Sequence, residues 1–218
     1  MPSFDQLKQR HRLLRDGYPQ NLNLRIHRAL SWLHRAEIAD DADSKFIFLW
    51  IAFNAAYAQE IDESIRLSEQ EAFKAFLEKL CHLDQAKKID DLVWKEFSQS
   101  IRLLLDNQFV FQSFWDFQSG KISEDDWKER FAKGKHAAHA ALTSGNSAIL
   151  LGIVFNRIYT LRNQLIHGGA TWNSAVNRKQ LTDCVRLMGK LVPIVIELMM
   201  DNPNTIWGAA VYPVIGEG

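Results

Sequence analysis

The sequence predicts an all-α fold, and three observations support this prediction. Apolar residues recur at helical spacing along almost the whole chain, whereas strict alternation is rare. The 218 residues include only 5 prolines. No internal repeat or low-complexity segment interrupts the pattern. Because a chain of this length can bury a sizeable core without disulfides or metals, we expect residues 1–218 to form one domain.

Two helices are expected in the first quarter of the chain. After a turn at 19–23, the segment LRIHRALSWLHRAE carries one apolar stripe, formed by Ile26, Ala29, Leu30, Leu33 and Ala36. The polar stretch DDADS then offers helix-capping residues. The next segment, KFIFLWIAFNAAYA, is apolar on nearly all sides, which is typical of a helix at the centre of a bundle.

The middle of the chain is expected to be helical as well. The segment Ser68-Glu69-Gln70-Glu71 has the pattern of a capping box and opens a helix that runs to about His82. Residues 84–107 have the apolar spacing of one further helix, and the aromatic stretch FVFQSFWDF follows them. A second cap, Ser123-Glu124-Asp125-Asp126, precedes WKERFAKGKHAAHAAL.

The last two helices complete the expected core. ILLGIVFNRIYTLRNQLI is a strongly apolar helix that Gly168-Gly169 ends, and a long helix is expected from about Ala175 to Met200. The order is therefore two helices, an insertion, and two helices. We expect a four-helix bundle built from residues 22–61 and 147–200, a helical insertion at 62–146 packed beside it, and a C-terminal tail at 201–218 without helical pattern.

Composition bounds the possible environments and partners. Lys plus Arg equals Asp plus Glu, at 26 each, so contact with nucleic acid requires a local basic patch. Cys81 and Cys184 lie far apart without a partner pattern, which favours a reducing compartment. The charged N-terminus does not have the pattern of a signal peptide, and no apolar run reaches the ~18 residues of a membrane helix. We expect a cytoplasmic protein without membrane contact.

The main chemical signal is the segment Arg162-Asn163-Gln164-Leu165-Ile166-His167 at the end of an apolar helix. Arginine is always charged and can hold a phosphate through two parallel hydrogen bonds. Histidine can take and give a proton near neutral pH. Together they suffice for metal-free RNA cleavage, in which the ribose 2′-hydroxyl is the nucleophile and the arginine offsets the charge that builds on the phosphate.

The position of this pair distinguishes it from other Arg/His pairs in the chain. It lies at a helix end, a polar residue follows the arginine, and two glycines follow the histidine. Residues five apart on an ideal helix point about 140° away from each other, so the helix must end or distort near Ile166 if both side chains are to converge. Two pairs at looser spacing lack these features, namely Arg28 with His34 and Arg130 with His136.

With these residues the chain resembles the HEPN family (higher eukaryotes and prokaryotes nucleotide-binding). The family motif has an arginine, a polar residue and a histidine after four to six intervening positions, at the end of the third helix of a four-helix core. RIHRALSWLHRAE and FLWIAFNAAYA are similar to the first two core helices of bacterial members. The resemblance covers roughly 22–61 and 147–200.

The resemblance implies a metal-independent endoribonuclease without a cofactor, acting on an RNA substrate as a homodimer whose two motifs face one cleft. Many such proteins belong to toxin–antitoxin or antiphage systems, which implies an antitoxin or defence-system partner protein. By resemblance, Arg162 and His167 are catalytic and Asn163 supports them. Family toxins paired with a nucleotidyltransferase antitoxin often carry a tyrosine two residues after the histidine, where this chain has Gly169.

The residues themselves leave alternatives open. Arg162 and His167 could merely decorate a helix C-terminus, where cations are favourable. Asn54 could cap a backbone group, orient His167 or touch substrate. His136 and His139 lack partners at ligand spacing, so no metal site is expected.

The three arginines of the first helix segment allow two readings. Arg25, Arg28 and Arg35 could form a basic wall for RNA, although a solvated face with snorkelling side chains is the stronger reading. Two other classes of function also remain: a non-catalytic HEPN-like module that binds a nucleotide, an RNA or a protein partner, and a purely structural helical scaffold.

Overall fold

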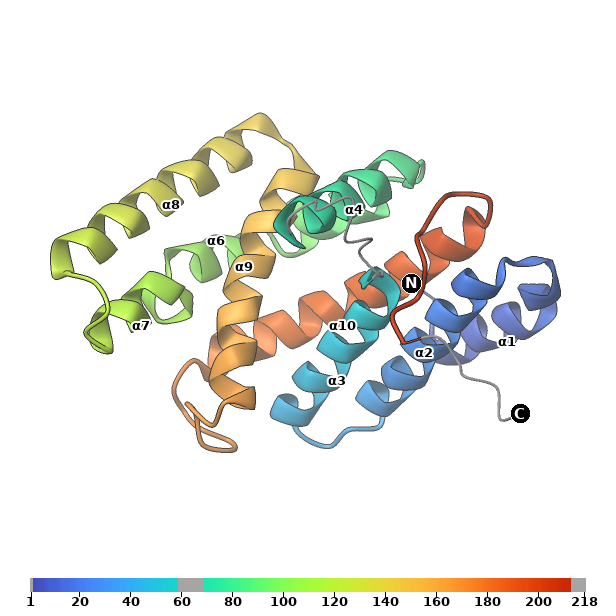
Figure 1. The fold of residues 1–218 in the computed structure, drawn as a ribbon, viewed down its shortest axis with the longest axis horizontal. Coiled ribbons are helices and arrows are strands. Elements are labelled where there is room, and N and C mark those ends of the chain that lie inside the picture. Colours follow the sequence, from blue (N-terminus) through green and yellow to red (C-terminus); the bar gives the residue numbers. More distant parts are fainter. Residues whose placement is uncertain (1, 59–68, 213–218) are drawn as a thin grey trace.

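A computed structural model describes residues 2–58 and 69–212 (Figure 1). The described residues are 77% helical, and these two ranges contain no β-strand. The α-helices are α1 (Phe4–Leu14), α2 (Gln20–Glu37), α3 (Ala42–Tyr57), α4 (Glu69–Leu83), α5 (Lys88–Asp90), α6 (Ser98–Asp106), α7 (Gln112–Gln118), α8 (Glu124–Ser144), α9 (Ser147–Ile166) and α10 (Arg178–Asp201). No helix within the described ranges is long and apolar enough to cross a membrane.

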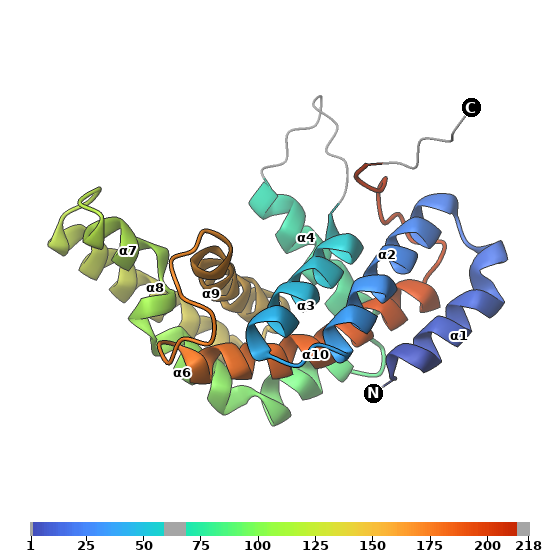
Figure 2. The ribbon, with the colours of Figure 1, turned by 90° about the horizontal axis from the view of Figure 1, so that it is seen from below.

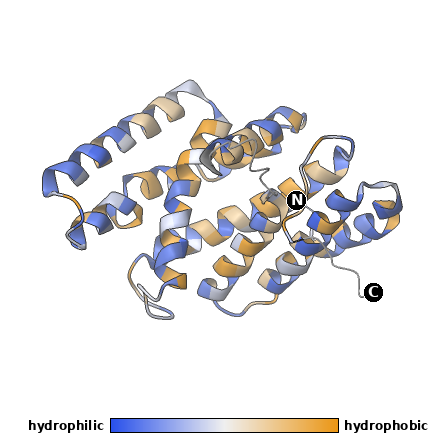
Figure 3. Ribbon diagram, viewed as in Figure 1, coloured by the Kyte–Doolittle hydropathy of each residue, from blue (hydrophilic) through white to orange (hydrophobic). Residues whose placement is uncertain are grey.

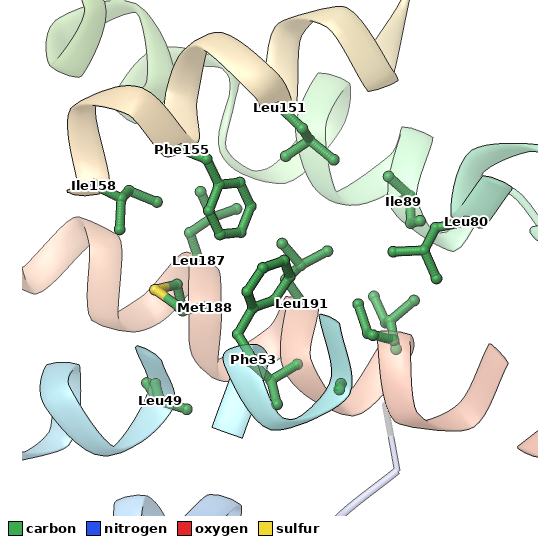
Figure 4. Packing of buried hydrophobic residues seen from close by; sticks show 14 of the residues in the cluster. Leu49, Phe53, Leu80, Ile89, Leu151, Phe155, Ile158, Leu187, Met188 and Leu191 are labelled. Atoms are coloured by element: carbon green, nitrogen blue, oxygen red, sulfur yellow. The ribbon is translucent and has the colours of Figure 1, made fainter. Parts of the chain in front are cut away.

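Helices α2, α3 and α10 lie side by side, with α1 against the outer face of α2 (Figures 1 and 2). Helix α9 crosses this layer, and its side chains meet those of α3 and α10 in the core (Figure 4). The packed residues at this crossing include Leu49, Phe53, Leu151, Phe155, Ile158, Leu187, Met188 and Leu191. Because α9 is anchored on its buried side, its last turn is held at the edge of the layer.

The segment between α3 and α9 contributes to the same core. Helix α4 packs along α9, and both α6 and α8 also contact α9. Buried residues of this segment join the hydrophobic cluster that α2, α3 and α10 form, among them Phe76, Leu77, Leu80, Ile89, Leu92 and Val93. Helix α9 therefore has α4, α6 and α8 as neighbours as well as α3.

The expected single helix at 84–107 is wrong, because the chain turns before it and breaks within it. The Asp84 carboxylate accepts a hydrogen bond from the backbone N–H of Ile89 at 2.6 Å, and Lys87 has a left-handed backbone with φ of 53°. Such side-chain bonds compete with helical ones. A π-helical turn at Asp91–Glu96 follows, and α6 begins only after Phe97.

The N-terminal region is more helical than expected. The turn at 19–23 is wrong, since α2 already begins at Gln20 with Pro19 at its N-cap, a place where proline removes no helical bond. Helix α1 was not expected, although Ser3 and Gln6 form a capping box at its start. The predicted cap at Ser123 is confirmed, with Asp126 as its partner. Ser68, in the other predicted cap, lies outside the described residues.

The segment 202–212 runs back along α2, and two arginines hold it there (Figure 2). Arg25 is 1% exposed. Its guanidinium donates to backbone carbonyls on both sides, those of Ala56, Ala58, Trp207 and Ala209. Arg28 donates to the carbonyls of Val211 and Tyr212. Arg25 is therefore neither part of a basic surface for RNA nor part of a solvated face, and both interpretations are wrong for this residue. The segment 202–212 covers this face of α2.

Candidate functional site

Helix α9 carries the Arg162–His167 segment on its last turn. The side chain of Asn146 accepts a hydrogen bond from the N–H of Ile149 and caps the start of the helix. Ten residues between Ser147 and Leu161 are buried. From Arg162 onward the side chains become half-buried, and from Ile166 onward they are exposed. The buried part of α9 thus fixes the position of its more exposed last turn.

The Arg162 guanidinium is held by its neighbours on the same helix. Its Nη1 donates to Oδ1 of Asn163 at 2.9 Å. Its central carbon lies 5.8 Å from the centroid of the Tyr159 ring, which is a favourable place for a cation. Its Nε is buried and has no hydrogen-bond partner among the residues that the structure describes. Asn163 therefore orients the guanidinium.

His167 lies at the end of the same helix but away from Arg162. Its backbone N–H still bonds to the carbonyl of Asn163, four residues earlier. Helical geometry thus continues to this residue and places it about 140° around the axis from Arg162 and about 7.5 Å along it. Helix α9 ends at Ile166, as expected, and Gly168, whose φ is +70°, turns the chain away from the helix axis. Because His167 still makes the last helical hydrogen bond, this helix end does not by itself bring the Arg162 and His167 side chains to one point.

The loop after His167 is tied back to α3. The Asp43 carboxylate accepts from the backbone N–H of Asn173 at 3.0 Å and from both terminal nitrogens of Arg178 at 3.1 Å. A charge-assisted pair of this kind is stronger than a neutral hydrogen bond. It fixes where the loop leaves α9 and where α10 begins.

A pocket of about 400 Å³ opens beside Arg162. Helices α3, α4 and α9 contribute its walls, which are formed by Trp50, Asn54, Tyr57, Phe73, Phe155, Asn156, Tyr159 and Arg162. Asn54 and Arg162 thus share one site, whereas His167 is not among the lining residues. The side-chain amide of Asn54 makes no hydrogen bond in the described part of the chain, so it caps no backbone group.

The sequence interpretation missed Trp50, Asn156 and Tyr159. A signal for two of them is visible in the sequence, since Asn156, Tyr159 and Arg162 follow one another at three-residue spacing on an otherwise apolar helix. Residues three apart lie on one helix face. Trp50 gave no such signal, because it looks like any aromatic residue of an apolar helix.

The remaining reactive side chains are accounted for by packing or exposure. His34 stacks on Phe4 with a centroid distance of 4.3 Å. Burial raises the pKa of the Cys81 and Cys184 thiols to about 12, which disfavours the reactive thiolate. In the residues that the structure describes, no three His, Cys, Asp or Glu side chains gather in a way that could hold a metal ion.

Comparisons with known proteins add no family to this description. No family model, no curated protein and no solved structure matches the chain.

Proposed function

We propose that the protein is a metal-independent endoribonuclease of HEPN type. The observation that carries this proposal is the state of Arg162 at the edge of a pocket, with Asn163 orienting its guanidinium and its Nε without a partner. A guanidinium held in this way can hold a phosphate and offset the charge that develops on it. His167 stands exposed one turn further on and serves as the proton carrier.

The proposed reaction uses only groups of the RNA and the protein. One histidine takes the proton of the ribose 2′-hydroxyl, whose oxygen then attacks the adjacent phosphorus. The bond from phosphorus to the 5′-oxygen breaks, and a second histidine gives that oxygen a proton. The products are a 2′,3′-cyclic phosphate and a 5′-hydroxyl.

We propose a homodimer because one chain keeps Arg162 and His167 on different sides of α9. A two-fold axis near the helix end would place His167 of one protomer towards Arg162 of its partner and would supply two histidines. Large apolar side chains are exposed around this end, namely Tyr159, Ile166, Trp172 and Val176 at 49%, 46%, 73% and 67%. Exposed apolar side chains favour association.

The biological setting follows the resemblance. Within this proposal the protein is cytoplasmic, requires no cofactor, and belongs to a toxin–antitoxin or antiphage system with an antitoxin or defence-system partner protein. The four-helix HEPN-type core would then consist of α2, α3, α9 and α10, with the helices of 62–146 as its insertion.

The test is cleavage of total RNA by the purified wild-type protein. Loss of the acid–base group in His167→Ala should lower the rate by about 10²–10⁴-fold, and Arg162→Ala by about 10²–10³-fold. The double variant should cleave RNA no more slowly than the slower of the two single variants, since both groups serve one transition state. EDTA should have no effect, and the products should end in a 2′,3′-cyclic phosphate.

Two matched histidine variants serve as controls. His136→Ala on α8 and His34→Ala on α2 should cleave like the wild type. Sedimentation should give a dimer at micromolar concentration, and a 25.1 kDa monomer would contradict the assembly. Absence of cleavage by the wild type, or full cleavage by His167→Ala, would remove the catalytic proposal.

The second candidate is a non-catalytic HEPN-like module that binds a nucleotide, an RNA or a protein partner. The separation of His167 from Arg162 within one chain favours it. The cleavage assay separates the two candidates, because a binding module leaves RNA intact while still retaining it.

A further inference from the structure

The pocket beside Arg162 combines aromatic surfaces with polar groups that have no partner. Tyr159 is 49% exposed and its ring lies 5.9 Å from that of Trp50. Phe155 lies 6.4 Å from Trp50 on the inner side, and Tyr57 and Phe73 complete the apolar lining. Aromatic walls around a pocket of about 400 Å³ suit a flat organic ring.

Several hydrogen-bonding groups of this pocket are unused. The Trp50 indole nitrogen and the Arg162 Nε are buried without a partner. The side-chain amides of Asn54 and Asn156 make no hydrogen bond within the described ranges. Buried donors of native proteins are nearly always paired, so the unpaired Trp50 and Arg162 nitrogens indicate a polar ligand. Asn54 is half-buried and Asn156 is exposed, so their amides can be reached by such a ligand.

The arrangement fits a nucleobase better than a purely apolar ligand. An asparagine amide presents a donor and an acceptor side by side, as the edge of a base does. Bases of single-stranded RNA are recognised by stacking on aromatic rings and by hydrogen bonds to their edges. An apolar molecule would occupy the same space but leave the two amides unpaired.

We propose that this pocket receives one unstacked base of single-stranded RNA, next to the phosphate that Arg162 holds. The inference rests on the proposed ribonuclease, because Arg162 belongs to both sites. Tyr159 stacks on the base and the amides of Asn54 and Asn156 bond to its edge. Cleavage then prefers unpaired RNA, since a base within a duplex cannot enter the pocket.

The first experiment measures binding to the full-length wild-type protein by calorimetry. Mononucleotides contain no phosphodiester bond, so binding can be separated from cleavage. The probes are 5′-AMP and 5′-UMP, adenosine without a phosphate, and ribose 5-phosphate without a base. A nucleotide should bind about 5- to 100-fold more tightly than ribose 5-phosphate, because stacking of one base contributes about 1–3 kcal/mol. Equal binding of all four probes, or no binding of either nucleotide, overturns the proposal.

The variants test the two contributions of the pocket. Tyr159→Ala should weaken nucleotide binding about 5- to 100-fold, which is the stacking contribution expressed as a fold-change. Tyr159→Phe should bind like the wild type, because it keeps the ring. Asn54→Ala and Asn156→Ala should each weaken binding, whereas Asn21→Ala, an exposed asparagine of α2, should not. A fully binding Tyr159→Ala overturns the base site.

Cleavage assays of the same variants distinguish failure of this inference from failure of the ribonuclease. If Tyr159→Ala binds and cleaves like the wild type while His167→Ala is inactive, the ribonuclease stands and the base site fails. If Tyr159→Ala weakens nucleotide binding and the wild type cuts no RNA, the ribonuclease proposal fails and the pocket belongs to a binding module. Thermal unfolding of each variant checks that the fold is retained.

Discussion

The layer of α2, α3 and α10 and the arm formed by α7 and α8 are built very differently, although both are helical. Helix α10 buries 13 of its 24 residues, whereas α8 buries 3 of its 21. Figure 3 shows the same contrast, with hydrophilic colouring along much of α8. Because burial of apolar surface is the main stabilising term, the two regions should contribute very unequally to stability.

Two buried arginines, one on α2 within the layer and one on α9 facing the arm, have different surroundings. Arg25 bridges α2 to the end of α3 and to the C-terminal segment through backbone carbonyls. Arg157 of α9 is 4% exposed, and its Nε and Nη2 have no partner. Its guanidinium carbon lies 4.3 Å from the ring centroid of Phe111. Burial lowers the pKa of both arginines to about 10.

A small residue of the arm lies opposite Arg157 on α9. A Cβ atom at Gly134 of α8 would lie 3.4 Å from Nη2 of Arg157 and 3.3 Å from Cε2 of Phe111. A buried charge can thus be stabilised by carbonyl dipoles or by an aromatic face, and only the first arrangement satisfies most of its donors.

Amide hydrogen exchange should show the largest difference. Local opening of α8 exposes little buried surface, whereas opening of α10 disrupts the core. Mid-helix amides of α8 should therefore exchange on the order of 10²-fold or more faster than those of α10. Exchange resolved by mass spectrometry of peptides measures both. Equal protection of the two helices would mean that the arm unfolds only with the core.

Replacing Arg25 should cause the largest loss of stability among the substitutions. Arg25→Met removes hydrogen bonds from a charged group and leaves buried carbonyls without a donor, so we expect a loss of about 3 kcal/mol in the free energy of unfolding. Urea unfolding measures the change. Arg35→Met is the matched control on the same helix, where an exposed arginine lies over Phe48, and it should change stability by less than about 0.5 kcal/mol.

Replacing Arg157 should have a much smaller effect. Arg157→Met removes a buried charge whose Nε and Nη2 are already unpaired, and it keeps an unbranched chain against Phe111. Such replacements are often neutral or stabilising, so we expect a change within about 1 kcal/mol. If Arg157→Met lost as much free energy of unfolding as Arg25→Met, the Phe111 ring would stabilise Arg157 to the same extent as the backbone carbonyls stabilise Arg25.

Acid should weaken the packing of α1 against the layer through His11, with the smallest of the four effects. Burial lowers the pKa of His11 below its ordinary 6.5, although a hydrogen bond to Asn23 opposes the shift. The unfolded chain therefore binds the proton more readily, so stability is fully present above pH 6.5 and declines as the pH falls below it. His11→Gln should reduce this decline in urea unfolding at several pH values. If the unfolding free energy of His11→Gln declines with falling pH as steeply as that of the wild type, His11 is not the cause of the decline.

The predicted helices and the candidate site were accessible from the sequence to different extents. The cap at Ser123 and the apolar spacing of α2, α3, α9 and α10 located these helices, since such signals act within one or two turns. The break before Lys88 was missed, because a side chain of the preceding turn competes for the backbone there. Arg162 and Asn163 do interact as neighbours in the sequence, while the partnership of Arg162 with Asn54 and Trp50 joins two distant helices.

Helicity and the segment with the most suggestive chemistry can be read from the sequence, because periodicity, caps and the order Arg162 to His167 are local properties. The positions of these residues in space depend on contacts between distant parts of the chain. Burial of Arg25 depends on a C-terminal segment more than 180 positions away, at Trp207 and Ala209. The pocket beside Arg162 exists because α3, α4 and α9 meet, and no local pattern encodes a contact between helices.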